Sequence, residues 1–158
     1  MRPAGRPGVS WILDGRLLVG EYPKPGDAAW LRDEHGVTDV LSLQDDADLA
    51  AKNLELKVLE REFRAHGLGF HHHPIQDGDT ADLAARLPAV VAGLHDLLTR
   101  DRRVLLHCNA GFNRAPTVAI AYLHVHCGLS LQEAWETVKR RRSCAPYRTA
   151  LDLCFGAR

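Results

Sequence analysis

The chain has 158 residues, enough to bury about 70% of its unfolded surface in one domain without disulfides. Its 20 basic and 20 acidic residues balance, so no overall charge favours nucleic acid or an anionic membrane. The four cysteines lack paired spacing for zinc or disulfides, which suits a reducing compartment, and no run of 18 apolar residues is present. We therefore expect a cytoplasmic, monomeric protein with no nucleic-acid or membrane partner.

In the first half of the chain, short strands alternate with helices. Residues 1–8 are rich in Pro and Gly and predict a loose tail. We then expect, in chain order, strands at about 9–13 and 16–20, a helix at 26–35, a strand at 37–43, a helix at 47–66 and a strand at 68–73. Gly36 and Gly67 should end the two helices, because glycine readily adopts the left-handed conformation after a last helical turn.

The second half begins with a helix at about 80–100 and a buried strand at 102–106. The helix after Arg114 carries Pro116 in its first turn and ends at Gly128, and Ser130 begins a capping box for a helix to about Arg142. A short last helix holds Leu151 and Phe155. This order predicts a single α/β domain with a central, mainly parallel sheet flanked by helices, and ligands should bind at the carboxyl ends of its strands.

Cys108 and Arg114 are separated by five residues and follow the strand at 102–106. A loop that turns back over five residues can aim its backbone N–H groups inward, while Arg114 closes the ring with a planar pair of donors. The result is a socket for a phosphate dianion, in which amides, guanidinium and a helix N-terminus favour a thiolate at Cys108. The expected substrate-binding residues are Asn109, Ala110, Gly111, Phe112, Asn113 and Arg114.

These residues also predict a chemistry. A thiolate attacks phosphorus in line and forms a phosphocysteine, which divides one difficult displacement into two easier ones. Asp77, on a loop beside Gly78, is the candidate general acid, and Asp79 is its rival two residues away. His107 should orient the loop and favour ionisation of the neighbouring thiol. Because Arg114 and the amides supply the positive charge that phosphoryl transfer needs, we expect no metal or other cofactor.

The sequence around residues 107–114 resembles the cysteine-dependent protein tyrosine phosphatase superfamily, in which His-Cys, five residues and Arg are followed by Ser or Thr. The short length is similar to that of its small dual-specificity branch. Residues 10–22 look like the opening strand pair of that family, and residues 35–43 look like its first helix-to-strand passage. The segment His73–Gly78 is similar to the loop that carries the general acid, so the resemblance gives that role to Asp77.

One residue departs from the family pattern. Ala115 stands where most members carry a hydroxyl that helps the cysteine leave in the second step. The resemblance implies a dual-specificity phosphatase-like catalytic domain over residues 9–158, and the Arg-Ala-Pro sequence here is similar to regenerating-liver and plant glucan phosphatases. We therefore expect an active site in which the phosphocysteine breaks down more slowly than in members that carry the hydroxyl.

Three other groups of residues are expected to have structural roles. His71, His72 and His73 alternate in direction along a strand, so they cannot converge on one ion and should lie at a strand edge near the site. Cys127 and Cys154 should be packed thiols, and the sequence selects no redox partner for Cys108. The run Arg140–Arg142 ends a helix, where cations are usually solvated; docking of an anionic substrate is the alternative.

The socket itself limits the substrate. No Lys, Arg or His lies between Cys108 and Arg114, which disfavours polyphosphorylated lipid head groups. The expected substrates are phosphotyrosine and phosphoserine or phosphothreonine on proteins, and phosphorylated carbohydrate is the alternative because Phe112 can contact a ring or a sugar chain. A low-turnover phosphate-binding module is a second hypothesis. A sulfurtransferase or arsenate reductase with a related loop is a third.

Overall fold

In the computed structural model, which describes residues 5–156, five strands form one sheet in the order β1-β2-β5-β3-β4. β1 pairs with β2 antiparallel, and every other neighbouring pair is parallel, which confirms the predicted mainly parallel α/β sheet. The strands are β1 (Val9–Leu13), β2 (Leu17–Gly20), β3 (Asp39–Ser42), β4 (Gly69–His72) and β5 (Val104–His107).

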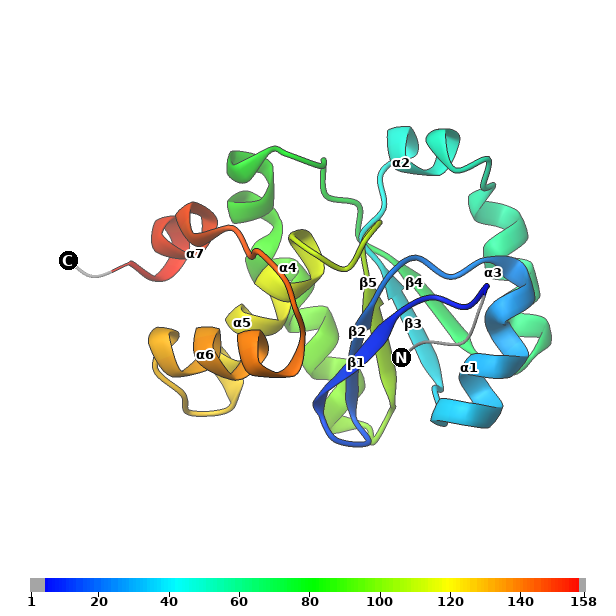
Figure 1. Cartoon of the computed structure of the whole chain (residues 1–158), viewed down its shortest axis with the longest axis horizontal. Helices are drawn as coiled ribbons and strands as arrows, with labels where there is room; N and C mark the ends of the chain where they lie inside the picture. Colours follow the sequence, from blue (N-terminus) through cyan, green and yellow to red (C-terminus); the bar gives the residue numbers. More distant parts are fainter. Residues whose placement is uncertain (1–4, 157–158) are drawn as a thin grey trace.

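Helices cover both faces of this sheet, as Figure 1 shows. α1 (Ala28–His35) and α3 (Leu56–Ala65) pack on one face around Leu18, Val40 and Phe63. The helices on the other face are α4 (Thr80–Thr99), α5 (Arg114–His126), α6 (Leu131–Arg141) and α7 (Arg148–Phe155). All four residues of β5 are buried, since this strand lies in the middle of the sheet with helices on both sides.

The helix predicted over 47–66 is wrong as a single element. It forms two helices, α2 (Asp46–Ala51) and α3, because Asn53 adopts the left-handed conformation with φ 55°. Asparagine tolerates that conformation better than most residues, and the backbone N–H of Leu54 then closes back on the carbonyl of Leu49 at 2.9 Å. The break places α2 beyond the carboxyl ends of the strands (Figure 1), where Asp48 of α2 accepts a hydrogen bond from Asn109 in the loop after β5.

Part of the predicted tail belongs to the domain. Arg6 donates to the carboxylate of Asp27 at 2.9 Å and its guanidinium lies over the ring of Trp30. The backbone N–H of Gly8 donates to the Glu21 carboxylate at 2.6 Å. Residues 1–4 of the predicted tail lie outside the described residues.

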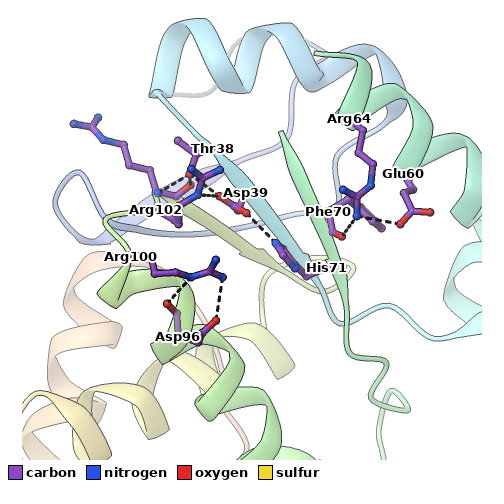
Figure 2. Close-up of polar contacts among 10 residues, drawn as sticks. Thr38, Asp39, Glu60, Arg64, Phe70, His71, Asp96, Arg100 and Arg102 are labelled. Atoms are coloured by element: carbon purple, nitrogen blue, oxygen red, sulfur yellow. Dashed lines mark hydrogen bonds and ion pairs between the residues drawn. The ribbon is translucent and has the colours of Figure 1, made fainter. Parts of the chain in front are cut away.

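A buried carboxylate holds the amino ends of three strands together (Figure 2). Asp39 accepts hydrogen bonds from Arg102 at 2.6 Å, Thr38 at 2.7 Å and His71 at 2.8 Å. Burial alone would raise the pKa of Asp39, but these three hydrogen bonds outweigh it and lower the pKa below its ordinary value. Because Asp39 pairs in register with Gly69 of β4 and Val104 of β5, this network fixes the end of the sheet opposite the site.

Candidate active site

The loop after β5 has the predicted strand-loop-helix setting. β5 ends at His107, residues 108–113 form the loop, and α5 begins at Arg114. Cys108 is only 2% exposed. A cavity of about 70 Å³ opens above it, and its lining residues are Asp77, Cys108, Asn109, Ala110, Phe112, Asn113 and Arg114. The structure therefore brings together the predicted nucleophile, the arginine and the candidate acid.

Every carbonyl from Cys108 to Phe112 is bonded away from the cavity. Their donors are the imidazole of His107, the N–H of Tyr22, the guanidinium of Arg142 for both Ala110 and Gly111, and the N–H of Ala145. In a trans peptide the carbonyl and the next N–H point in opposite directions, so outward carbonyls turn the N–H groups of residues 109–113 inward. Within residues 5–156 these N–H groups have no acceptor, which leaves five donors for an anion.

The tight turn of this loop requires glycine at position 111. Gly111 has φ +65°, and a Cβ there would lie 2.5 Å from the carbonyl carbon of Gly20. The loop thus passes directly over the end of β2, and any larger residue would push it away from the sheet.

Arg114 is the largest fully buried side chain of the described protein and is held by three hydrogen bonds. Its guanidinium contacts both oxygens of Asp48, at 2.7 and 3.3 Å, and donates to the carbonyl of Ile75 at 2.8 Å. Burial would raise the pKa of Asp48, but the hydrogen bonds from Arg114 and from Asp45 lower it overall. Asp48 therefore stays ionised and fixes the fork of Arg114 at the edge of the cavity.

Asp48 and Gln44 are site residues that the sequence analysis missed. The side-chain amide of Asn109 donates to Asp48 at 2.8 Å and accepts from Gln44 at 2.8 Å. One signal was available: Asp45 and Asp48 form a reciprocal capping box directly after β3, which positions acidic side chains at the carboxyl edge of the sheet. Nothing in the sequence indicated that this box would contact Arg114.

The two candidate acids occupy different positions. Asp77 is half exposed, lines the cavity above Cys108, and places one carboxylate oxygen 3.5 Å from Nε of Arg114. Asp79 instead caps α4 by accepting the backbone N–H of Asp82 at 2.9 Å. The geometry supports Asp77 as the residue that can reach a bound phosphoester.

His107 is fully buried, and its Nδ1–H donates to the carbonyl of Cys108 at 2.9 Å. Burial lowers the pKa of His107 from 6.5 to about 4. The imidazole is therefore neutral at pH 7 and adds no positive charge to the thiol. Its contribution is to hold the first carbonyl of the loop outward.

Ala115 lies in the first turn of α5 and is fully buried. The nearest hydroxyl along the helix, that of Thr117, donates to the carbonyl of Asn113 and accepts from the N–H of Tyr147. It is thus engaged in structure and does not replace the missing hydroxyl. Phe112, 45% exposed, stands at the rim of the cavity.

The remaining sequence predictions have mixed outcomes. Adjacent histidines of the edge strand β4 turn to different partners, since His71 bonds Asp39 and His72 bonds the carbonyl of Gln44. Residues 5–156 contain no group of three His, Cys, Asp or Glu arranged to hold a metal. Cys154 packs against the core as expected, but Cys127 is exposed because it follows the last buried turn of α5.

A wider groove adjoins the cavity above Cys108 and shares Asp77 and Asn109 with it. It has a volume of about 670 Å³. Its charged lining residues are Asp45, Asp46, Asp48, Asp77, Asp82 and Arg86. Arg86 is paired with Asp82 at 2.8 Å, so the groove presents an acidic surface beside the socket. Elsewhere, no helix within the described range is long and apolar enough to span a bilayer.

Comparison with known proteins agrees with this geometry. Residues 29–150 match the family model described as dual specificity phosphatase, catalytic domain. The phosphoglucan phosphatase DSP4 of Castanea sativa is 35% identical over 139 residues, which cover 85% of this chain and 36% of that protein. The human dual specificity protein phosphatase 22 is 29% identical, over 87% of this chain and 66% of that protein. The chain thus spans about a third of the plant relative's length.

Solved structures show the same fold. The chain is similar to the active form of Tk-PTP with a TM-score of 0.76 and 28% identity, over 98% of this chain and 97% of that one. Kinase associated phosphatase is similar with a TM-score of 0.80 and 20% identity, over 97% of this chain and 94% of that one. The family match covers well over half of the chain and includes both the Asp77 loop and the Cys108 loop. The chain belongs to the dual specificity phosphatase catalytic domain family.

Proposed function

We propose that the protein hydrolyses phosphomonoesters through a phosphocysteine on Cys108. One observation carries the proposal: five consecutive carbonyls of the 108–112 segment are bonded outward, so that five backbone N–H groups converge above a buried sulfur. Preorganised amides of this kind bind the equatorial oxygens of a phosphoryl group at no cost in reorganisation during the reaction. Arg114, fixed by Asp48, adds two charged donors.

In the first step, the sulfur of Cys108 forms a bond to phosphorus as the bond to the ester oxygen breaks. Asp77 gives its proton to that leaving oxygen. In the second step, water attacks phosphorus, the S–P bond breaks, and the Asp77 carboxylate takes a proton from the water. The products are an alcohol or phenol and inorganic phosphate. Arg114 and the amides carry the charge in both steps, so the scheme uses no metal.

Phosphotyrosine and phosphoserine or phosphothreonine on proteins are the substrates we favour. The acidic groove beside the socket repels a second phosphate, which argues against polyphosphorylated head groups. A polypeptide can lie along this groove while its single phosphate enters the socket. We also infer that the protein acts in the cytoplasm, because a thiol nucleophile survives in a reducing compartment. We expect it to act there as a monomer.

Phosphorylated glucan is the second candidate substrate. The observation that favours it is the 35% identity to a plant phosphoglucan phosphatase over 85% of the chain. The Arg-Ala-Pro sequence at residues 114–116, which resembles that of plant glucan phosphatases, points the same way. Release of phosphate from phosphorylated amylopectin and from phosphopeptides, measured side by side, separates the two substrate classes.

The mechanism is tested by hydrolysis of aryl phosphates in the presence of a metal chelator. We expect Cys108→Ser to abolish turnover, and Asp77→Asn to lower kcat by about 10²-fold or more, with a larger loss for poorer leaving groups. Asp79→Asn is the matched control, because asparagine caps a helix as well as aspartate does. Turnover that survives in Cys108→Ser, or that requires the metal, contradicts the mechanism. A larger loss in Asp79→Asn than in Asp77→Asn contradicts the choice of acid.

A folded protein that binds vanadate but releases no phosphate would instead be a phosphate-binding module. Ala115 is the residue that would explain such a result, because the second step lacks the hydroxyl usual at that position.

A further inference from the structure

Arg142 is the one residue of the basic run Arg140–Arg142 that reaches the phosphate loop. It follows the last turn of α6, and its backbone is extended there. Its Nε donates to the carbonyl of Gly111 at 2.7 Å, and a second nitrogen donates to the carbonyl of Ala110 at 3.1 Å. The third nitrogen donates to the hydroxyl of Ser10 on β1 at 3.1 Å. The expectation that this run is simply solvated is therefore wrong for Arg142.

These contacts determine the direction of two peptide units. A carbonyl that points at Arg142 forces the N–H of the following residue to point the opposite way. The bond to the Ala110 carbonyl thus turns the N–H of Gly111 toward the cavity, and the bond to the Gly111 carbonyl does the same for Phe112. The remaining carbonyls of the loop use other donors, so these two amides depend on this one side chain.

We propose that Arg142 is a positioning residue of the active site. From the outer side of the 108–113 loop, it holds the amides of Gly111 and Phe112 toward the phosphoryl oxygens. The proposal rests on the proposed phosphatase function. Arg142 acts from the outer side of the loop and does not touch the substrate, in contrast to Arg114. The planar guanidinium suits this role because one rigid group can serve two successive carbonyls and Ser10 at once.

The neighbouring arginines differ in their surroundings and provide the control. Arg141 turns to the carboxylate of Asp14 at 2.7 Å, and Arg140 is exposed on the same helix. If the basic run attracted substrate by charge, Arg140 and Arg142 would have similar effects. If Arg142 positions the loop, its substitution should lower activity much more than substitution of Arg140. That loss of activity should not depend on the salt concentration.

The test compares Arg142→Met, Arg142→Lys and Arg140→Met, all confirmed as folded by circular dichroism at the assay temperature. For Arg142→Met we expect about a tenfold or greater loss of vanadate affinity and about a 10²-fold loss of kcat/KM, as for removal of oxyanion donors. Arg142→Lys should recover part of both, because one ammonium can still serve one carbonyl. Arg140→Met should stay within about twofold of the wild type.

Amide NMR of the unliganded protein separates the two explanations, because general destabilisation would not shift the resonances of particular loop amides. In Arg142→Met, the resonances of Gly111 and Phe112 should shift more than those of Asn109 and Asn113. Wild-type vanadate affinity in Arg142→Met, or equal and salt-dependent losses in Arg142→Met and Arg140→Met, would overturn the proposal. If the wild type neither binds vanadate nor releases phosphate, the proposed function fails, while the resonances still decide whether Arg142 holds these two amides.

Discussion

The buried imidazole of His107 makes stability depend on pH in a defined window. In the folded protein its pKa is lowered by burial from 6.5 to about 4, whereas the unfolded chain keeps the ordinary value. As the pH falls below 6.5, His107 binds a proton in the unfolded state but not in the folded state. The folded state therefore loses stability from about pH 6.5 to about pH 4, and below pH 4 both states are protonated and the loss stops.

The size of the effect follows from the shift. A pKa that is lowered from 6.5 to about 4, at 1.36 kcal/mol for each pKa unit, gives a total of about 3 kcal/mol. Between pH 7 and pH 4.5 the linkage relation gives about 2 kcal/mol of this total. For a domain with an unfolding free energy of about 5–15 kcal/mol, such a change is readily measured.

The assay is urea unfolding followed by circular dichroism at pH 7.0, 5.5 and 4.5, for the wild type and His107→Asn. Asparagine keeps an N–H donor for the carbonyl of Cys108 but does not titrate. As the pH falls from 7.0 to 4.5, the unfolding free energy of the wild type should fall by about 2 kcal/mol relative to that of the variant. Because His73 and His126 also have lowered pKa values, only this difference isolates His107. A gap that stays constant with pH, at unchanged m-values, would refute the reasoning.

Four further substitutions test other parts of the site and the fold. Asp48→Ala leaves Arg114 buried without its carboxylate, so it should cost about 3–5 kcal/mol in urea unfolding and weaken vanadate binding; an unchanged affinity would remove Asp48 from the site. Ala115→Ser should speed the breakdown of the phosphocysteine, seen as a smaller burst and a higher steady-state rate, and an unchanged or lower rate would exclude this explanation. Asp39→Ala should lower stability by about 2–3 kcal/mol at pH 7 and lose that cost as the pH falls below about 3.8, because the pKa of Asp39 is lowered in the folded state. Arg102→Gln, which alters a half-exposed partner of Asp39, should cost less than about 1 kcal/mol by thermal melting.

The sequence predicted the parts of the protein that depend on neighbours in the chain. The strand before Cys108, the loop and the helix after Arg114 form one continuous segment, and their order follows from apolar runs and turn residues. Ser130 and Glu133 form the predicted capping box at the start of α6, because that motif is complete within four residues.

Elements that depend on a single backbone conformation were harder to predict. The segment 47–66 has a continuous helical pattern, and only the left-handed backbone at Asn53 divides it. Asparagine adopts that conformation often but not always, so the pattern alone could not locate the break. The same break determines where α2 lies and hence where Asp48 can reach.

Contacts between side chains that lie far apart along the chain could not be predicted from the sequence. Asp48 and Arg114 are 66 residues apart, and Arg142 lies 31 residues from Gly111. Composition and periodicity give the face on which a residue lies but not the particular atom that it meets. The sequence therefore identified residues that line the cavity above Cys108 and missed those that hold them in place.

The buried carboxylates of Asp39 in β3 and Asp48 in α2 illustrate why this distinction matters for function. Asp39 and Asp48 lie at opposite edges of the sheet, and both are ionised through hydrogen bonds to an arginine. The partner of Asp39 extends toward solvent, so that network contributes to folding alone. The partner of Asp48 lines the cavity above Cys108, so the same kind of pair here sets both stability and the position of the guanidinium beside the thiol. An aspartate beside an arginine is thus functional or structural according to the end of the strands at which it lies.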